Sequence, residues 1–377
     1  MRHFVSTPLA LFWLTWSLTL RKTMASSASV LGHGNMASSA SSFFLRQIST
    51  IEVAKYQKTC YGYRKNRFFI NFIIRKQAFR TSELCLGFVG TTVAIVNQER
   101  NFLGIQFTEG EGKLPKVLLK SNSGSEAEVY LFGGCVTSWK VANDKDLLFV
   151  RPDAVFNGKK PISGGIPHCF PQFGPGSMQQ HGFARNMTWS VAKSENAEGN
   201  PVLTLELKDD PYSRSMWNFA FLASYKVALN SKSLSTELVI TNTDSKPFSF
   251  NSALHTYFRG FISAVSVKGL KGCKTLNKDP DPSNPIEKTE EREVITFPGF
   301  VDCIYLDAPE ELHLNNGLGD IISIRNQNWT DAVLWNPYTQ MESCYRDFVC
   351  VENAKIGQVT LESGQSWTAK QYINLNE

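Results

Sequence analysis

Three separate segments of this chain carry side chains that could do acid–base chemistry. They are Pro161–Arg185 with His168, His181 and Arg185, Asn251–Tyr257 with His255, and Phe348–Gly357 with Glu352. Near neutral pH a carboxylate can accept a proton and a histidine can donate one. If the fold brings the segments together, they could form one proton-transfer site.

The segment Pro161–Arg185, PISGGIPHCFPQFGPGSMQQHGFAR, contains five glycines and four prolines in 25 residues. Gly and Pro at this density exclude a regular helix or strand. Rigid loops of this kind hold polar side chains in place on a scaffold. The alternative is a long connection in which the histidines are incidental, and the segment alone does not decide between the two.

His255 and Glu352 each stand at the end of a strand-like run, in FSFNSALHTYF and FVCVENAKIG. A carboxylate after a Val-Cys-Val run must be exposed or paired, because burying it without a partner costs several kcal/mol. A partner in a cleft is the interpretation that indicates function. The alternatives are a hydrogen-bonded core histidine and a surface glutamate.

The elements that must position these residues are β-strands. Leucines 203, 205 and 207 alternate with polar residues, and so do the apolar residues of 234–240. Further strands are expected at Glu128–Phe132, Ala220–Leu229, Asp331–Trp335, Phe348–Val351, Val359–Leu361 and Trp367–Ile373. Turn signals such as Gly133-Gly134 and Asn230-Ser231 separate them, and no window has a sustained helical stripe. The pattern predicts an all-β fold, a large antiparallel sandwich or barrel.

Charge divides the chain near residue 82. Residues 1–82 carry 12 Lys and Arg and one acid, Glu52, whereas the rest carries 27 Lys and Arg and 33 Asp and Glu. We therefore expect a disordered targeting leader at 1–82, which is basic and rich in Ser and Ala, and a single domain at 83–377. The apolar run within Phe4–Leu20 resembles a signal-peptide core, while the stretch after Met24 resembles a plastid or mitochondrial transit peptide.

These features favour a plastid location over secretion, with a cytosolic product also open. The domain is acidic and has no basic surface signal, so we expect it not to bind nucleic acid. The apolar run is too short for a membrane span, so we expect no stable membrane association of the mature domain. The eight cysteines form no CxxC pair and no zinc spacing, which predicts scattered buried thiols rather than a disulfide framework.

Six ordered motifs resemble one family. They are GGIPHCFPQFG, QQHGFAR, NSALHTYF, VDCIYL, LWNPY and VCVENAKIG. The chain resembles the aldose 1-epimerase (galactose mutarotase-like) superfamily over roughly residues 105–377, and within it the hexose-6-phosphate mutarotase branch, also called glucose-6-phosphate 1-epimerase. The resemblance implies an antiparallel β-supersandwich with a single sugar-binding cleft.

Interconversion of α and β anomers needs one general base for the C1 hydroxyl and one general acid for the ring oxygen, without metal or cofactor. The resemblance implies that Glu352 is the base and His255 the acid. It places His181 and Arg185 on sugar or ring-oxygen contacts, with Gln180 beside them, and Asp302 on sugar hydroxyls.

Ser163 departs from the pattern of this branch. The branch usually reads RGGIP where this chain reads Ser163-Gly-Gly-Ile-Pro, and that arginine is a phosphate ligand in the family. A serine supplies one hydrogen bond and no charge. Either Lys159, Lys160, His168 or Arg185 supplies the charge, or the protein favours another ligand or has become a weak catalyst.

The sequence therefore predicts a monomeric isomerase that acts on an aldohexose 6-phosphate, with glucose 6-phosphate as the expected substrate. A mutarotase for unphosphorylated sugars and a non-catalytic carbohydrate-binding protein on the same fold are the alternatives. An acid–base pair argues against the second, because binding alone does not need one. A glycosidase would need two carboxylates that flank the bond.

Overall fold

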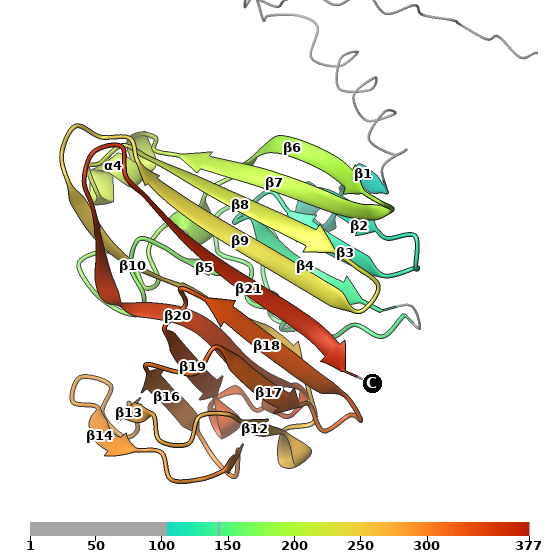
Figure 1. Cartoon of the computed structure of the whole chain (residues 1–377), viewed down its shortest axis with the longest axis vertical. Helices are drawn as coiled ribbons and strands as arrows, with labels where there is room; N and C mark the ends of the chain where they lie inside the picture. The colour runs from blue at the N-terminus through green and yellow to red at the C-terminus, as the bar shows by residue number, and fades with distance from the viewer. Residues whose placement is uncertain (1–103, 142–143, 377) are drawn as a thin grey trace, which may run out of the picture. The chain divides into compact units, whose positions relative to one another are not determined.

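The computed structural model describes residues 104–141 and 144–376, and these residues form three antiparallel sheets (Figure 1). The first is a four-stranded sheet, in the order β1 (Ile105–Glu109), β2 (Pro115–Lys120), β3 (Glu126–Tyr130) and β4 (Cys135–Lys140). The leader predicted at 1–82 lies outside the described residues, so that division stays a prediction.

The second sheet has eight strands and carries the candidate site. Its order is β14 (Ile286–Thr289), β13 (Lys274–Asn277), β16 (Val301–Leu306), β19 (Asp331–Asn336), β20 (Phe348–Leu361), β10 (Phe248–Leu254) and β5 (His168–Cys169), with β11 (Tyr257–Arg259) also paired to β20.

The third sheet has nine strands. Its order is β15 (Val294–Thr296), β12 (Ser266–Lys268), β17 (Glu311–Asn315), β18 (Ile321–Gln327), β21 (Ser366–Asn376), β9 (Ser233–Asn242), β8 (Phe221–Leu229), β7 (Asn200–Lys208) and β6 (Ser190–Ala197).

Helices are short in the part of the chain that the structure describes. They are α4 (Pro211–Met216) and the 3₁₀ turns η1 (Glu111–Lys113), η2 (Ala184–Asn186), η3 (Ile262–Ala264), η4 (Tyr338–Met341) and η5 (Tyr345–Asp347). None of these helices is long and apolar enough to cross a bilayer. The prediction of an all-β antiparallel fold is confirmed.

The alternation of apolar and polar residues in the sequence explains why the strands of the nine-stranded sheet form. In β7 and β9 every second residue is buried, as the leucine pattern predicts, because one face of this sheet packs on the core and the other is open. The buried side chains join the other sheets in one main core, to which Trp139, Tyr225 and Val351 belong.

One prediction about the strands is wrong. Phe348–Val351 and Val359–Leu361 are not two strands but parts of the single 14-residue strand β20. The polar residues between them continue the ladder, paired with β10 and β19. Strands β20 and β21 lie in the middle of the eight- and nine-stranded sheets respectively, so the end of the described chain joins the two halves of both (Figure 1).

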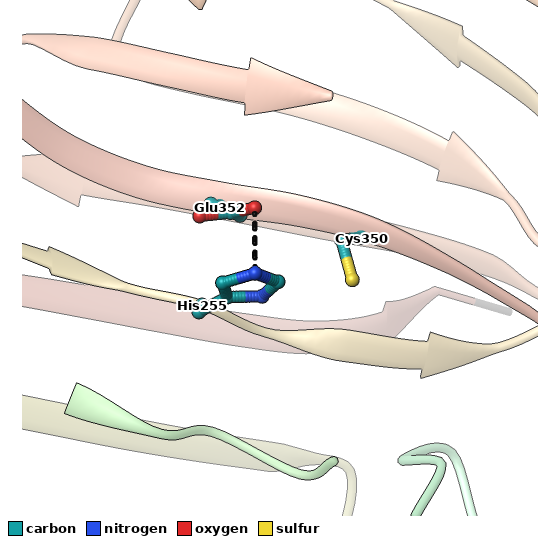
Figure 2. A group of neighbouring side chains, drawn as sticks. All are labelled: His255, Cys350 and Glu352. Atoms are coloured by element: carbon teal, nitrogen blue, oxygen red, sulfur yellow. Dashed lines mark ion pairs between the residues drawn. The ribbon is translucent and has the colours of Figure 1, made fainter. Parts of the chain in front are cut away.

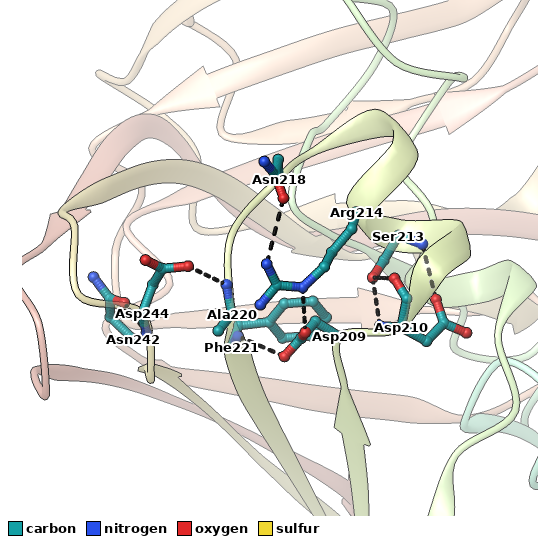
Figure 3. Close-up of polar contacts among 9 residues, drawn as sticks. All are labelled: Asp209, Asp210, Ser213, Arg214, Asn218, Ala220, Phe221, Asn242 and Asp244. Atoms are coloured by element: carbon teal, nitrogen blue, oxygen red, sulfur yellow. Dashed lines mark hydrogen bonds and ion pairs between the residues drawn. The ribbon is translucent and has the colours of Figure 1, made fainter.

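The connection from β7 to β8 is fastened by side chains (Figure 3). Asp210 caps α4 by accepting from the backbone N–H of Ser213 at 2.9 Å. Asp209 accepts from Arg214 at 2.6 Å and from the backbone of Phe221 at 3.3 Å. Phe221, held in this way, is one of the aromatic residues that support the loop of the candidate site.

Candidate active site

Strand β20 positions Glu352. Neighbouring side chains of a strand point to opposite faces. Val349 and Val351 enter the main core, so Cys350 and Glu352 project from the other side of the eight-stranded sheet, called here the outer face. Figure 2 shows both side chains on the same strand, with His255 opposite them.

His255 and Glu352 meet on this face. His255 Nε2 lies 3.4 Å from Glu352 Oε1, and the residues are only 8% and 3% exposed (Figure 2). The His255 ring stacks on Tyr257 at 4.8 Å and meets the edge of Trp335 at 5.7 Å, which fixes its orientation. The expectation of an open pocket around the pair stays a prediction.

Burial sets the protonation of this pair. It raises the pKa of the Glu352 carboxyl to about 8, although the positive charge of Lys278 limits the rise. Burial also lowers the pKa of His255 well below its ordinary value of 6.5, and the neighbouring His181 and Arg185 lower it further. At neutral pH the pair therefore holds one proton, on Glu352.

His181 offers an N–H donor beside the pair. Its ring centre lies 5.5 Å from that of His255. The backbone N–H of Gly174 donates to His181 Nδ1 at 3.1 Å, so the ring proton of the neutral histidine is on Nε2. The imidazole stays neutral because burial, with Arg185 and Lys278, lowers its pKa to about 3. Gln180 is exposed and its amide lies 3.3 Å from His181 Nε2, at the rim of the site.

Two glycines let the loop approach its neighbours. Gly165 and Gly182 have φ angles of 69° and 70°, in the region that favours glycine. A Cβ would lie 2.0 Å from Val136 O at the first position and 2.3 Å from Phe170 O at the second. Phe170 itself packs on Phe221, with ring centres 5.3 Å apart, so the loop rests on the main core.

Arg185 is held against this loop. Its Nε donates to the carbonyl of His168 at 2.8 Å and its Nη2 lies 3.2 Å from Cys169 Sγ. Cys169 Sγ is in turn 3.4 Å from His181 Nδ1, which places the guanidinium close to the histidines. The suggestion that His168 could bind phosphate is wrong. Its ring is 1% exposed and stacks on Trp189 in the core.

A row of residues in register crosses the outer face. Asp302 pairs with Trp335, Trp335 with Cys350 and Cys350 with Tyr257. Neighbouring strands lie about 4.8 Å apart, so the row spans roughly 14 Å. Asp302 and the acid–base pair thus occupy one surface, and the half-buried ring of Trp335 lies between them, where it can pack on an apolar face of a ligand.

Lys278 is a site residue that the sequence analysis missed. It lies in KDPDPSNP, which has the composition of a surface loop, yet its Nζ is 3.0 Å from Asp302 Oδ1. Its ammonium also lies 5.2 Å from the ring centre of Phe173, which borders His181. A charged side chain directly after β13, opposite a carboxylate on β16, was the available signal.

A chain of hydrogen bonds between buried side chains connects the sequence neighbours of His255 and Glu352. Gln371 donates to Asn353 at 2.5 Å and to Thr256 at 3.2 Å, and accepts from Thr236 at 3.2 Å. Asn353 and Thr256 are the neighbours of Glu352 and His255 in the sequence. One amide on β21 therefore holds the side chains of the residues next to both members of the pair.

Cys350 completes a group that could hold a metal ion. His255, Cys350 and Glu352 each offer one ligand atom, and these atoms lie within 4.8 Å of one another. Ligands of one zinc ion, at about 2.0–2.3 Å from it, stand nearer to about 3.5 Å apart. A zinc ion would need a small movement of these side chains, and it would occupy both groups of the acid–base pair.

A groove of about 610 Å³ lies away from these residues. It is lined by the residues of two loops, α4, β6 and β7, among them Lys159, Asn186, Glu206 and Tyr212. Lys159 and Lys160 are exposed, and Lys159 faces this groove rather than the acid–base pair. The remaining predicted residue, Ser163, is half-buried beside Arg151, as described below.

Comparisons with known proteins agree with the fold described above. The family model described as aldose 1-epimerase matches residues 115–374. A Cenchrus ciliaris protein named "Putative glucose-6-phosphate 1-epimerase" is 34% identical over 276 residues, 68% of this chain and 83% of that protein. An Escherichia coli K12 protein with the same name is 32% identical over 244 residues, 61% and 79%. A Salmonella typhimurium structure described as a "putative mutarotase" has a TM-score of 0.65 at 24% identity, over 74% and 99% of the two chains.

Proposed function

Because this chain belongs to the aldose 1-epimerase family, we propose that it interconverts the α and β anomers of an aldohexose 6-phosphate, with glucose 6-phosphate as its substrate. The relatives at 34% and 32% identity carry the name of that activity. The observation that carries the proposal is the buried contact of His255 with Glu352 on the outer face.

The reaction needs one proton accepted and one donated. Transfer of the shared proton from Glu352 to His255 gives a carboxylate and an imidazolium, 3.4 Å apart. Glu352 then takes the proton of the C1 hydroxyl while His255 protonates the ring oxygen. The C1–ring oxygen bond breaks and the C1 carbonyl forms. After rotation about C1–C2 the same steps in reverse close the other anomer, and the pair regains its starting protons.

The other predicted residues suit binding. We propose that the Nε2–H of His181 and the guanidinium of Arg185 donate to sugar oxygens near the pair. Asp302, paired with Lys278, accepts from sugar hydroxyls at the other end of the row. Gln180 contributes from the rim.

Exchange NMR between the α and β anomers of glucose 6-phosphate tests this function. We expect exchange in the presence of the wild-type protein, and a loss of about 100-fold or more in Glu352→Gln, which cannot accept the C1 proton. Glu287→Gln, the same change at an exposed position of β14, is the matched control. Exchange at the wild-type rate in Glu352→Gln would reject the role of this carboxylate.

A mutarotase for unphosphorylated sugars is the second candidate, and Ser163 favours it because the motif arginine is missing. The same experiment with free glucose distinguishes the two. We further propose that the protein acts in a plastid, on the basis of the basic, Ser- and Ala-rich composition of 1–82. That the protein is a monomer stays a prediction. Import assays with a fused reporter test the location.

A further inference from the structure

Ser163 has an arginine directly beside it. Val150 pairs with Gly164 in an antiparallel bridge, and the backbone N–H of Arg151 donates to the carbonyl of Ser163 at 2.9 Å. Residues 151 and 163 therefore face each other across two neighbouring backbones. Position 163 carries a serine where the motif has an arginine, and a guanidinium is present at position 151 instead.

The backbone directs Arg151 toward the candidate active site. Phe149 and Arg151 are two residues apart on an extended segment, so their side chains point to the same face. Phe149 stacks on Phe348 at 5.2 Å and packs in one cluster with Tyr257 and Cys350. The backbone N–H of Phe149 also donates to the carbonyl of Tyr257 at 3.0 Å. Arg151 thus lies next to the residue on which His255 stacks.

The guanidinium of Arg151 is oriented and has donors to spare. Its Nε and Nη2 bond to the two carboxylate oxygens of Asp153 at 2.9 and 2.5 Å, which uses two of its five N–H donors. The Arg151 side chain is 17% exposed and that of Asp153 is 59% exposed. Asp153 therefore binds the Nε and Nη2 groups of the guanidinium from the solvent side, and the side chain of Arg151 lies mostly against the protein.

Three further cations, Arg185, Lys278 and Lys159, are less suited to a phosphate. Arg185 is bonded to the His168 carbonyl and to Cys169, and Lys278 is paired with Asp302 at 3.0 Å. Lys159 lines the separate groove. Of these side chains, Arg151 is the one that lies beside Ser163.

We propose that Arg151 binds the phosphate of the sugar phosphate in this protein, a role that the motif resemblance would give to an arginine at position 163. This inference rests on the proposed function. The three N–H groups that Asp153 does not use, two on Nη1 and one on Nη2, can donate to the dianion, and the hydroxyl of Ser163 adds one neutral donor. The phosphate site is then kept, but its arginine comes from the neighbouring segment at position 151 and not from position 163.

A reciprocal exchange of the two residues tests the proposal. The measured quantity is the ratio of kcat/KM for glucose 6-phosphate to kcat/KM for glucose, from exchange NMR, in the wild type, Arg151→Ser, the double variant Arg151→Ser with Ser163→Arg, and Arg325→Ser. Arg325 is an exposed arginine on β18 and serves as the matched control. Thermal unfolding by circular dichroism shows whether each variant is folded.

We expect Arg151→Ser to lower the ratio about ten- to a hundredfold, because a charge-assisted contact is lost. The double variant should regain most of it, which a merely structural role of Arg151 would not produce. An unchanged ratio in folded Arg151→Ser, or a wild type that does not prefer the phosphorylated sugar, would overturn this proposal and leave the mutarotase activity standing. A wild type that exchanges neither sugar would instead reject the proposed function itself.

Discussion

The pH dependence of catalysis follows from the single proton that His255 and Glu352 share. If Glu352 is the base and His255 the acid, the active form of the pair carries one proton in total, the same number as the resting form. Above the pKa of about 8 the pair loses this proton and the acid disappears. The value of kcat/KM should therefore fall as the pH rises through about 8.

The size of the fall follows from the same value. With a pKa of about 8, about nine tenths of the free enzyme carries the proton at pH 7 and about one tenth at pH 9, so kcat/KM should drop about tenfold over this range. Toward lower pH the rate should stay level through 6.5, because burial lowers the pKa of His255 well below that value.

Exchange NMR from pH 7 to 9.5 measures this profile. The phosphate of the substrate is already a dianion there, since its second pKa is about 6. The uncatalysed rate is subtracted at each pH, and any residual rate of Glu352→Gln should show no inflection near pH 8. A wild-type rate that rises through pH 8 would refute the reasoning. It would mean that ionised Glu352 works with neutral His255, and that another donor, such as His181, protonates the ring oxygen.

Four further outcomes are expected. Glu352→Gln and His255→Ala should each lower kcat about 10²–10⁴-fold, and the double variant should lose less than the product, as exchange NMR can show. The free energy of unfolding should decrease from pH 7 to 8.5, where the histidines of the unfolded chain are mostly neutral and folded Glu352 still holds a proton that the unfolded chain has released; urea titrations should show a flatter dependence in Glu352→Gln. Lys278→Ala removes a charge that limits the pKa of Glu352, so the fall in kcat/KM should move to higher pH. A protein that begins at Leu84 should keep its exchange activity, and cooperative loss of folding there would place part of the domain within 1–82.

The fold was predictable where one side of a sheet meets solvent. The alternating leucines of β7 and the alternation in β9 report such a sheet directly. Strand β20 could not be read in the same way, because residues 348–354 are buried on both faces and the pattern does not alternate. Its buried Asn353 is bonded by Gln371 on β21, a partner that the local pattern does not show, so the strand looked like two short ones.

The site was predictable where a motif carries the residue, and less so where pairing between strands decides. His168 and His255 both follow apolar residues, yet one ring lies in the core and the other meets Glu352. Lys278 sits beside Asp302 because β13 pairs with β16. Arg151 lies beside Ser163 through a bridge between irregular segments. These partners follow from tertiary structure, which local composition does not encode.

The central position of β20 and β21 has a consequence for synthesis of the protein. These strands are made last among those described, yet each sheet needs one of them in its middle. Glu352 follows His255 by 97 positions, so a nascent chain holds the histidine and much of both sheets long before the carboxylate arrives. Pairing between such distant segments is slow, and it leaves strand edges open until it is complete. The growing chain therefore remains without its acid–base pair, and dependent on protection from aggregation, until translation has passed β21.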